Sequence, residues 1–64
     1  MNLVREWTNK LKDVEQIICD YNKILENNEL THEMKIFCYR KIESKTKYKR
    51  LIETTINTLK ESEG

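Results

Sequence analysis

The fold is decided by residues 4–25, which read VREWTNKLKDVEQIICDYNKIL. Their large apolar residues recur at alternating steps of three and four, which places them on one stripe of an α-helix. The stripe consists of Val4, Trp7, Leu11, Val14, Ile18, Tyr21 and Leu25. This heptad spacing is typical of helices that pack on other helices, as in a coiled coil. We therefore predict a first helix over about residues 2–27.

This stripe is wider than a two-stranded coiled coil needs. Leu3, Ile17 and Ile24 each stand one position before a stripe residue and widen it on one side. Together these residues cover roughly 160° of the helix surface, so the helix can contact two neighbours. A chain of 64 residues is also too short to bury a large core by itself. We therefore expect a homo-oligomer.

The apolar pattern stops at residues 26–31, which read ENNELT. Asn27 and Asn28 suit the end of a helix or a left-handed turn, and Thr31 suits the N-cap of a following helix. Glu33 would then lie in the first turn, where the helix dipole favours a negative charge. We predict a turn over about residues 28–31 and a second helix over about residues 32–61. Its apolar face would run through Met34, Phe37, Cys38, Ile42, Tyr48, Ile52, Ile56 and Leu59, with Leu51 on one flank.

These elements predict an all-α fold in which residues 1–64 form a single antiparallel two-helix hairpin. We expect two hairpins to dimerise into a four-helix bundle. The core of the hairpin or of the dimer would consist of Val4, Trp7, Leu11, Val14, Ile18, Tyr21, Leu25, Met34, Phe37, Ile52, Ile56 and Leu59. Trp7 has an alternative role as an interface anchor, because tryptophan is enriched at binding hot spots.

The sequence offers little support for catalysis or metal binding. His32, the single histidine, falls in the expected turn with no serine or cysteine at a spacing that would place a nucleophile beside it. The chain has no Cys-x-x-Cys or closely spaced histidine pair that would hold a metal. We therefore predict a protein that is not an enzyme, with no catalytic residues, no metal site and no cofactor.

Two cysteines are too few for a disulfide scaffold. If the turn centres between residues 28 and 29, Cys19 and Cys38 lie at the same height in the hairpin. However, Cys19 points away from the apolar stripe, so we predict no bridge between them. The apolar runs, such as residues 17–19, are far shorter than the roughly 18 residues of a membrane span. These features favour a cytoplasmic protein with reduced thiols and no membrane partner.

Residues 39–50 carry six of the twelve basic residues and one acid, whereas residues 1–29 carry four basic and six acidic residues. A basic helix with interleaved tyrosines suits contact with nucleic-acid phosphates. Alternatively, the charges complement the more acidic first helix. The candidate phosphate-binding residues are Arg40, Lys41, Lys45, Lys47, Lys49 and Arg50. Lys41 and Lys45 also point into the apolar face of the second helix, where their stems can cover apolar surface.

A second candidate surface lies on the outer side of the second helix. Ile36 and Tyr39 point away from the expected packed face, and with Ile42 they form an exposed apolar strip. Exposed strips of this kind usually mark a contact with another protein. We therefore predict these three residues as the partner-binding site.

In length, and as two helices with a short turn and a heptad-like stripe, the chain resembles the small plasmid copy-control proteins of the Rop type. The resemblance implies two hairpins paired in an antiparallel four-helix bundle that binds RNA loop complexes. It covers the architecture only, so no functional residue is carried over. From the residues themselves we expect a small regulatory or inhibitory protein that self-associates and acts through protein–protein contact. The alternative is a nucleic-acid-binding dimer that uses the basic middle of the second helix.

Overall fold

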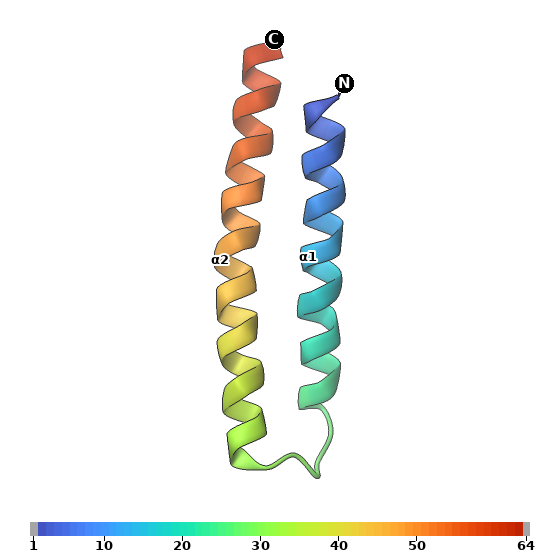
Figure 1. Ribbon diagram of the computed structural model, residues 1–64, viewed down its shortest axis with the longest axis vertical. Helices are drawn as coiled ribbons and strands as arrows, with labels where there is room; N and C mark the ends of the chain where they lie inside the picture. The colour runs from blue at the N-terminus through green and yellow to red at the C-terminus, as the bar shows by residue number, and fades with distance from the viewer. Residues whose placement is uncertain (1, 64) are drawn as a thin grey trace.

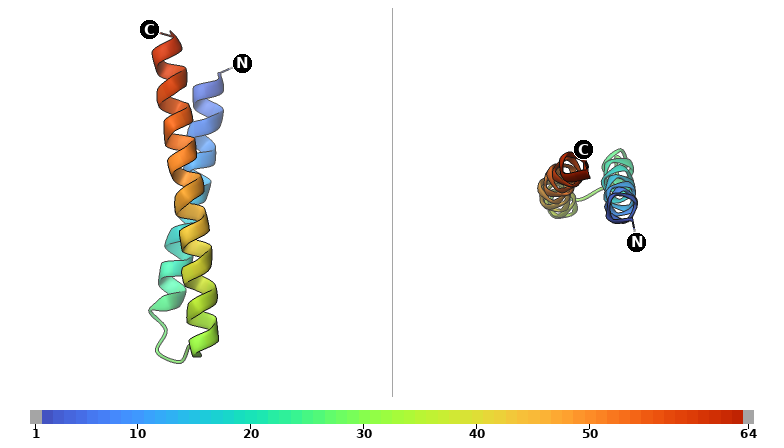
Figure 2. Two further views of the ribbon diagram at one scale, coloured as in Figure 1. Left: turned by 90° about the vertical axis from the view of Figure 1, so that its left-hand side faces the viewer. Right: turned by 90° about the horizontal axis from the view of Figure 1, so that it is seen from above.

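The computed structural model describes residues 2–63 as two helices that lie side by side and run in opposite directions (Figure 1). Helix α1 spans Leu3–Leu25 and helix α2 spans His32–Glu63. The molecule measures 50 × 15 × 14 Å, so it is one layer of two helices, as the end-on view in Figure 2 shows. The expected all-α fold is confirmed. Helix α1 ends two residues earlier than expected and α2 continues two residues further.

Both helices begin at a polar side chain that caps their free backbone N–H groups. The Asn2 side-chain oxygen accepts a hydrogen bond from the backbone N–H of Arg5 at 3.1 Å. The Thr31 hydroxyl oxygen accepts one from the backbone N–H of Met34 at 3.2 Å. Glu33 follows in the first turn of α2. The prediction of Thr31 as the cap of the second helix is therefore confirmed, whereas Asn2 was not predicted as a cap.

The connection between the helices consists of residues 26–31. The Asn27 side-chain oxygen accepts a hydrogen bond from the backbone N–H of Glu29 at 3.0 Å, which is an Asx turn. Of the two roles predicted for the asparagines, the end of a helix is confirmed for Asn27, whose backbone N–H donates to the Ile24 carbonyl directly after the C-cap Glu26. The left-handed conformation is wrong, because no non-glycine residue among the described residues 2–63 has a positive φ. The hydrogen bond to the Asn27 side chain turns the chain without a left-handed residue.

The packed seam between the helices is narrow. Val14, Ile52 and Ile56 are buried in one cluster, with the half-buried Val4, Trp7, Leu11 and Ile18 packed against it. Ile52 is 0% exposed, and burial of a side chain of this size contributes about 1.5–3 kcal/mol. Trp7 thus belongs to the core at the open end of the hairpin. Tyr21 and Leu25 are half-buried further along the same stripe.

The face of α2 that meets α1 is rotated from the one expected. The side chains with reduced exposure recur at heptad spacing through Cys38, Ile42, Lys45, Lys49, Ile52, Ile56 and Leu59. Met34 and Phe37, expected in the core of the hairpin or dimer, lie beside this seam and are about half exposed. The hairpin alone therefore leaves both side chains open, because two helices can bury only one stripe of each other.

The helices are also shifted along each other relative to a symmetric fold-back. A turn centred between residues 28 and 29 would place residue 43 beside Val14. In the structure Val14 shares its cluster with Ile52 and Ile56 instead. The reason lies in the connection, because α1 ends above the level at which α2 begins (Figure 1). The C-terminal end of α2 still extends slightly beyond the start of α1.

Candidate interaction surfaces

The broad side of the hairpin that carries Tyr21 and Phe37 is called here the open face. Six of the eight large apolar side chains that the structure exposes share the phase of this face: Leu3, Ile24, Met34, Phe37, Tyr48 and Leu51. On α2, Tyr48 and Leu51 follow Phe37 by eleven and fourteen residues, which are about three and four helical turns. On α1, Leu3 and Ile24 are separated by 21 residues, about six turns. Both helices therefore present apolar residues to the same side.

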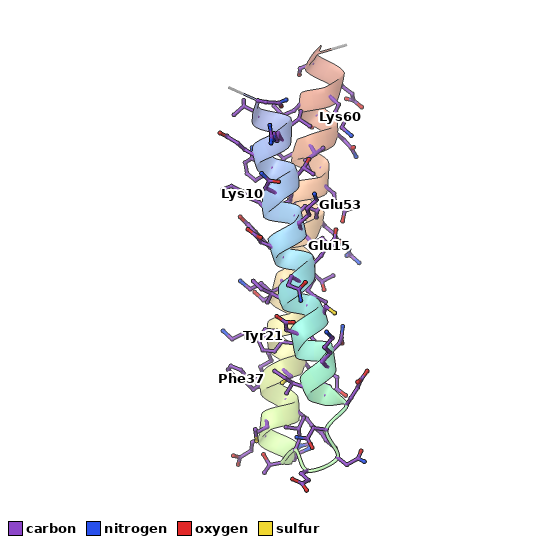
Figure 3. All side chains as sticks on the ribbon, turned by 90° about the vertical axis from the view of Figure 1, so that its right-hand side faces the viewer. Lys10, Glu15, Tyr21, Phe37, Glu53 and Lys60 are labelled. Carbon is purple, nitrogen blue, oxygen red and sulfur yellow. The ribbon has the colours of Figure 1, made fainter. Side chains whose placement is uncertain are left out.

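Contacts between the helices fix this side near the turn. The rings of Tyr21 and Phe37 meet edge to face, with centroids 6.4 Å apart. Figure 3 shows both residues on one edge of the helix pair. Beside them is a groove of about 320 Å³ lined by Tyr21, Ile24, Glu33, Met34, Phe37 and Cys38. Phe37 is 54% exposed, so the edge-to-face pair is part of an accessible apolar surface.

Two lysines lie over aromatic rings, one on the open face and one at the packed seam. The ammonium nitrogen of Lys41 stands 5.5 Å from the centroid of Phe37, and that of Lys10 stands 5.0 Å from the centroid of Trp7. At these distances the cation interacts with the electrons of the ring face. Lys41 is exposed, as expected for a side chain whose stem covers apolar surface while its charge reaches water.

The opposite side of the hairpin is polar. Its groove, about 430 Å³, is lined by Glu15, Ile18, Cys19, Asn22, Lys23, Glu26 and Lys49. Glu15 and Glu53 point to this side, away from Tyr21 and Phe37 (Figure 3). Cys19 is exposed and Cys38 is buried, and both thiols are free, which confirms that the two cysteines form no bridge. The two broad faces of the molecule therefore differ sharply in polarity.

The predicted outer strip is partly present. Ile36 and Tyr39 are exposed on α2, and Tyr39 is 60% accessible. Ile42 differs from the expectation, because it is half-buried at a seam position between Cys38 and Lys45. Two of the three strip residues therefore remain available to a partner.

The basic residues of α2 point in three directions. Lys45 and Lys49 are half-buried at seam positions facing α1, and Lys41 lies on the open face. Arg40, Lys47 and Arg50 are exposed on the remaining surface of α2. Lys47 forms an ion pair with Glu43 at 3.4 Å, one turn earlier. The basic segment therefore divides its charges around the helix, and three of its six residues share the outer side.

Residue positions that could support chemistry are sparse in the described part of the chain. His32 is exposed at the first position of α2. Residues 2–63 contain no group of three His, Cys, Asp or Glu side chains that could hold a metal ion. Neither α1 nor α2 carries a stretch long and apolar enough to cross a membrane.

Comparison of the chain with protein-family models, curated proteins and solved structures finds no match. The candidate surfaces therefore rest on the chemistry of the residues themselves. The sequence indicated Leu3, Ile17 and Ile24 as a widening of the α1 stripe. On α2 the corresponding second stripe was not separated from the seam, because Met34, Phe37 and Tyr48 were assigned to the same apolar face as Ile52. The signal for it was present, because Met34, Phe37, Lys41, Ser44, Tyr48 and Leu51 repeat at steps of three and four.

Proposed function

We propose that this chain is a small, non-enzymatic regulatory or inhibitory protein that self-associates and acts through contact with another protein. The observation that carries the proposal is the exposure of eight large apolar side chains on a single layer of two helices. Contiguous apolar surface on a small protein usually marks an interaction site. The four buried apolar residues form a core too small to explain why the chain carries so many others.

The apolar side chains divide into two groups with different roles in this proposal. The six on the open face span both helices and suit contact with a further pair of helices. Ile36 and Tyr39 lie apart from that face on α2 and suit a partner of another kind. Aromatic anchors such as Tyr39 contribute strongly when a partner covers them. A hairpin of this kind can self-associate through one surface and contact its partner through the other.

A second function is favoured by the basic segment. Arg40, Lys47 and Arg50 are exposed on the outer side of α2, where they can reach phosphates of RNA or DNA. The pairing of Lys47 with Glu43 and the turning of Lys45 and Lys49 toward α1 reduce the charge that a nucleic acid would meet. We therefore place nucleic-acid binding second.

Two sets of substitutions distinguish these functions. Ile36→Ser with Tyr39→Ser should abolish co-purification of a protein partner from the source cell, because loss of an apolar anchor costs about 2 kcal/mol or more. Circular dichroism should show unchanged helicity, since both side chains are exposed. The second set tests nucleic-acid binding and changes Arg40, Lys47 and Arg50 to Gln. It leaves the half-buried Lys49 in place.

If the protein binds nucleic acid, the triple glutamine variant should lose retention on heparin. The slope of log K against log salt should flatten by about 0.7–0.9 for each phosphate that the variant no longer neutralises. In that case the double serine variant should bind as the parent does. A partner complex that survives the double serine change would contradict the proposed role of the outer strip.

A further inference from the structure

We propose that a second copy of this chain covers the open face, with the two-fold axis parallel to the helices and both turns at the same end. In this arrangement α1 of each copy packs against α2 of the other. The inference rests on the self-association in the proposed function and adds the surface, its occupant and the orientation.

The exposed area supports a partner of this size. The chain exposes 5308 Å², whereas a compact folded monomer of 7.8 kDa exposes about 4,400 Å². The excess of about 900 Å² is close to the roughly 800 Å² that each partner contributes to a stable protein interface. A second hairpin laid on one broad face would remove an area of this order. It would also convert a single layer into a two-layer bundle with an enclosed centre.

The open face has the shape that a two-fold contact between identical hairpins requires. Such a contact uses the same surface on both copies, so the surface must complement itself. The exposed apolar residues of this face extend from Leu3 to Ile24 on α1 and from Met34 to Leu51 on α2. Each helix would then bury a second stripe, which also runs along the helix but lies roughly 90° around it from the first stripe. That is the contact pattern of a four-helix bundle.

Charges beside the stripes select the orientation. On α1 the acids Glu6, Asp13 and Asp20 recur every seven residues along the edge of the open face, and all three are exposed. On α2 the corresponding edge carries Lys41, with Arg40 and Lys47 next to it. Glu43, which pairs with Lys47, and Glu33 near the turn offset part of this positive charge. Charges that flank an apolar seam set the choice of neighbour and its direction in helical assemblies. The row on α1 is therefore acidic on balance, although Lys10 lies within it, and the edge of α2 is basic.

Two arrangements of the pair are compatible with antiparallel neighbours. An axis perpendicular to the helices places α1 against α1 of the other copy, so that the acidic rows face each other. An axis parallel to the helices places each acidic row against the basic edge of the other α2. Like charges in contact disfavour the first arrangement, and opposite charges favour the second.

The heights of the charged residues agree with the second arrangement. Tyr21 contacts Phe37, and Val14 lies in one cluster with Ile52. The stretch of α1 from Val14 to Tyr21 therefore lies within the range of heights that residues 37–52 of α2 span. Rotation about an axis parallel to the helices keeps every residue at its own height. Asp13 and Asp20 would then meet the segment of the other copy that contains Arg40, Lys41 and Lys47.

A distance between the two turns tests the inference directly. A nitroxide label on Asn28→Cys, with Cys19→Ser and Cys38→Ala removing the native thiols, places one probe at the turn of each copy. If both turns lie at the same end, pulsed electron paramagnetic resonance should give a distance between the two labels well below half of the 50 Å length of the hairpin. Turns at opposite ends would give a distance approaching that length and would overturn the orientation. If Cys38→Ala lowers the melting temperature, Cys38→Val keeps more of the buried volume and carries the same test.

Sedimentation of two variants tests the surface. Leu51→Glu places a charge on the open face and should weaken the dimer at least about thirty-fold, as expected for a hot-spot position. Asn57→Glu places the same charge on the same helix away from that face and should leave the dimer intact. Equal dissociation constants for the two variants, or a parent that sediments as one chain, would overturn the inference. Loss of the partner complex in the Ile36 and Tyr39 variant with an intact dimer would show that the two surfaces act separately.

Discussion

At the scale of single residues, the most informative positions are Lys45 and Lys49. Both occupy seam positions where α2 faces α1, and both are half-buried. They separate the seam residues near the turn, Cys38 and Ile42, from the buried cluster around Ile52. A lysine stem can cover apolar surface there, but its ammonium group must still reach water. The hairpin is therefore held mainly at its open end, and the middle contributes less.

Lys45→Leu should stabilise the hairpin by about 1 kcal/mol, because an apolar side chain at a seam position gains burial without a charge to solvate. Urea unfolding followed by circular dichroism would measure the change at a fixed protein concentration. Lys12→Leu is the matched control, because that side chain is exposed on α1 outside the seam and should change stability by less than about 0.5 kcal/mol. A lower stability of Lys45→Leu would show that the ammonium group of Lys45 makes a favourable contact in the seam.

At the scale of the helices, α2 combines a strong start with a weak end. The Thr31 hydroxyl caps its first turn. Its last third is rich in hydroxyl side chains that bond the carbonyl four residues earlier, as Thr55 does to Leu51 at 2.8 Å and Ser62 does to Thr58 at 3.0 Å. Such residues have modest helix propensity and compete with the backbone for hydrogen bonds. The end of α2 therefore depends on packing more than on its own sequence.

The same substitution should have opposite effects at the two ends of α2. Thr31→Ala removes the cap and should lower the free energy of unfolding by about 1 kcal/mol. Thr54→Ala, at an exposed position inside the helix, should raise it by up to about 0.7 kcal/mol, because alanine is the better helix former. Thermal and urea unfolding of both variants would give the two signs. A neutral Thr31→Ala would mean that the turn at Asn27 is sufficient to start the helix.

At the scale of the whole molecule, the small core follows from the single layer of two helices. A layer measuring 50 × 15 × 14 Å has two broad faces and almost no interior, and Ile52 is its one fully buried large side chain among the residues described. One broad face of this layer is polar and the other is apolar. Nothing within the hairpin covers the apolar face. A second layer is the simplest way to give the chain a core of ordinary size.

The melting temperature should therefore rise with protein concentration, because folding and association are coupled when a monomer has so small a core. Melts at several concentrations spanning two orders of magnitude, with equilibrium sedimentation at each, would establish this. A sharp melt at the same temperature for every concentration, with a mass of one chain, would contradict self-association. The Asn57→Glu variant should follow the parent in this experiment, whereas Leu51→Glu should melt earlier at every concentration.

The sequence by itself determined the parts of the fold that depend on local interactions. The steps of three and four along residues 4–25 predicted α1 and its packed stripe, and the polar residues 26–31 predicted the connection. Thr31 could be recognised as a cap because a cap needs only its own hydroxyl and the next turn of backbone. The exposed state of Cys19 followed from its phase on the same helix.

Only the tertiary structure decided which stripe of α2 faces α1. The helix carries two overlapping heptad series, one through Cys38 and Ile52 and one through Phe37 and Leu51, and each series contains lysine. Apolar content alone favoured a face that includes Phe37, yet the pair of helices buries the series of Cys38. A single neighbour can cover only one of the two stripes. Which one it covers depends on how the connection sets the rotation and height of α2 against Val14 and Tyr21, a relation between distant residues that neither helix encodes alone.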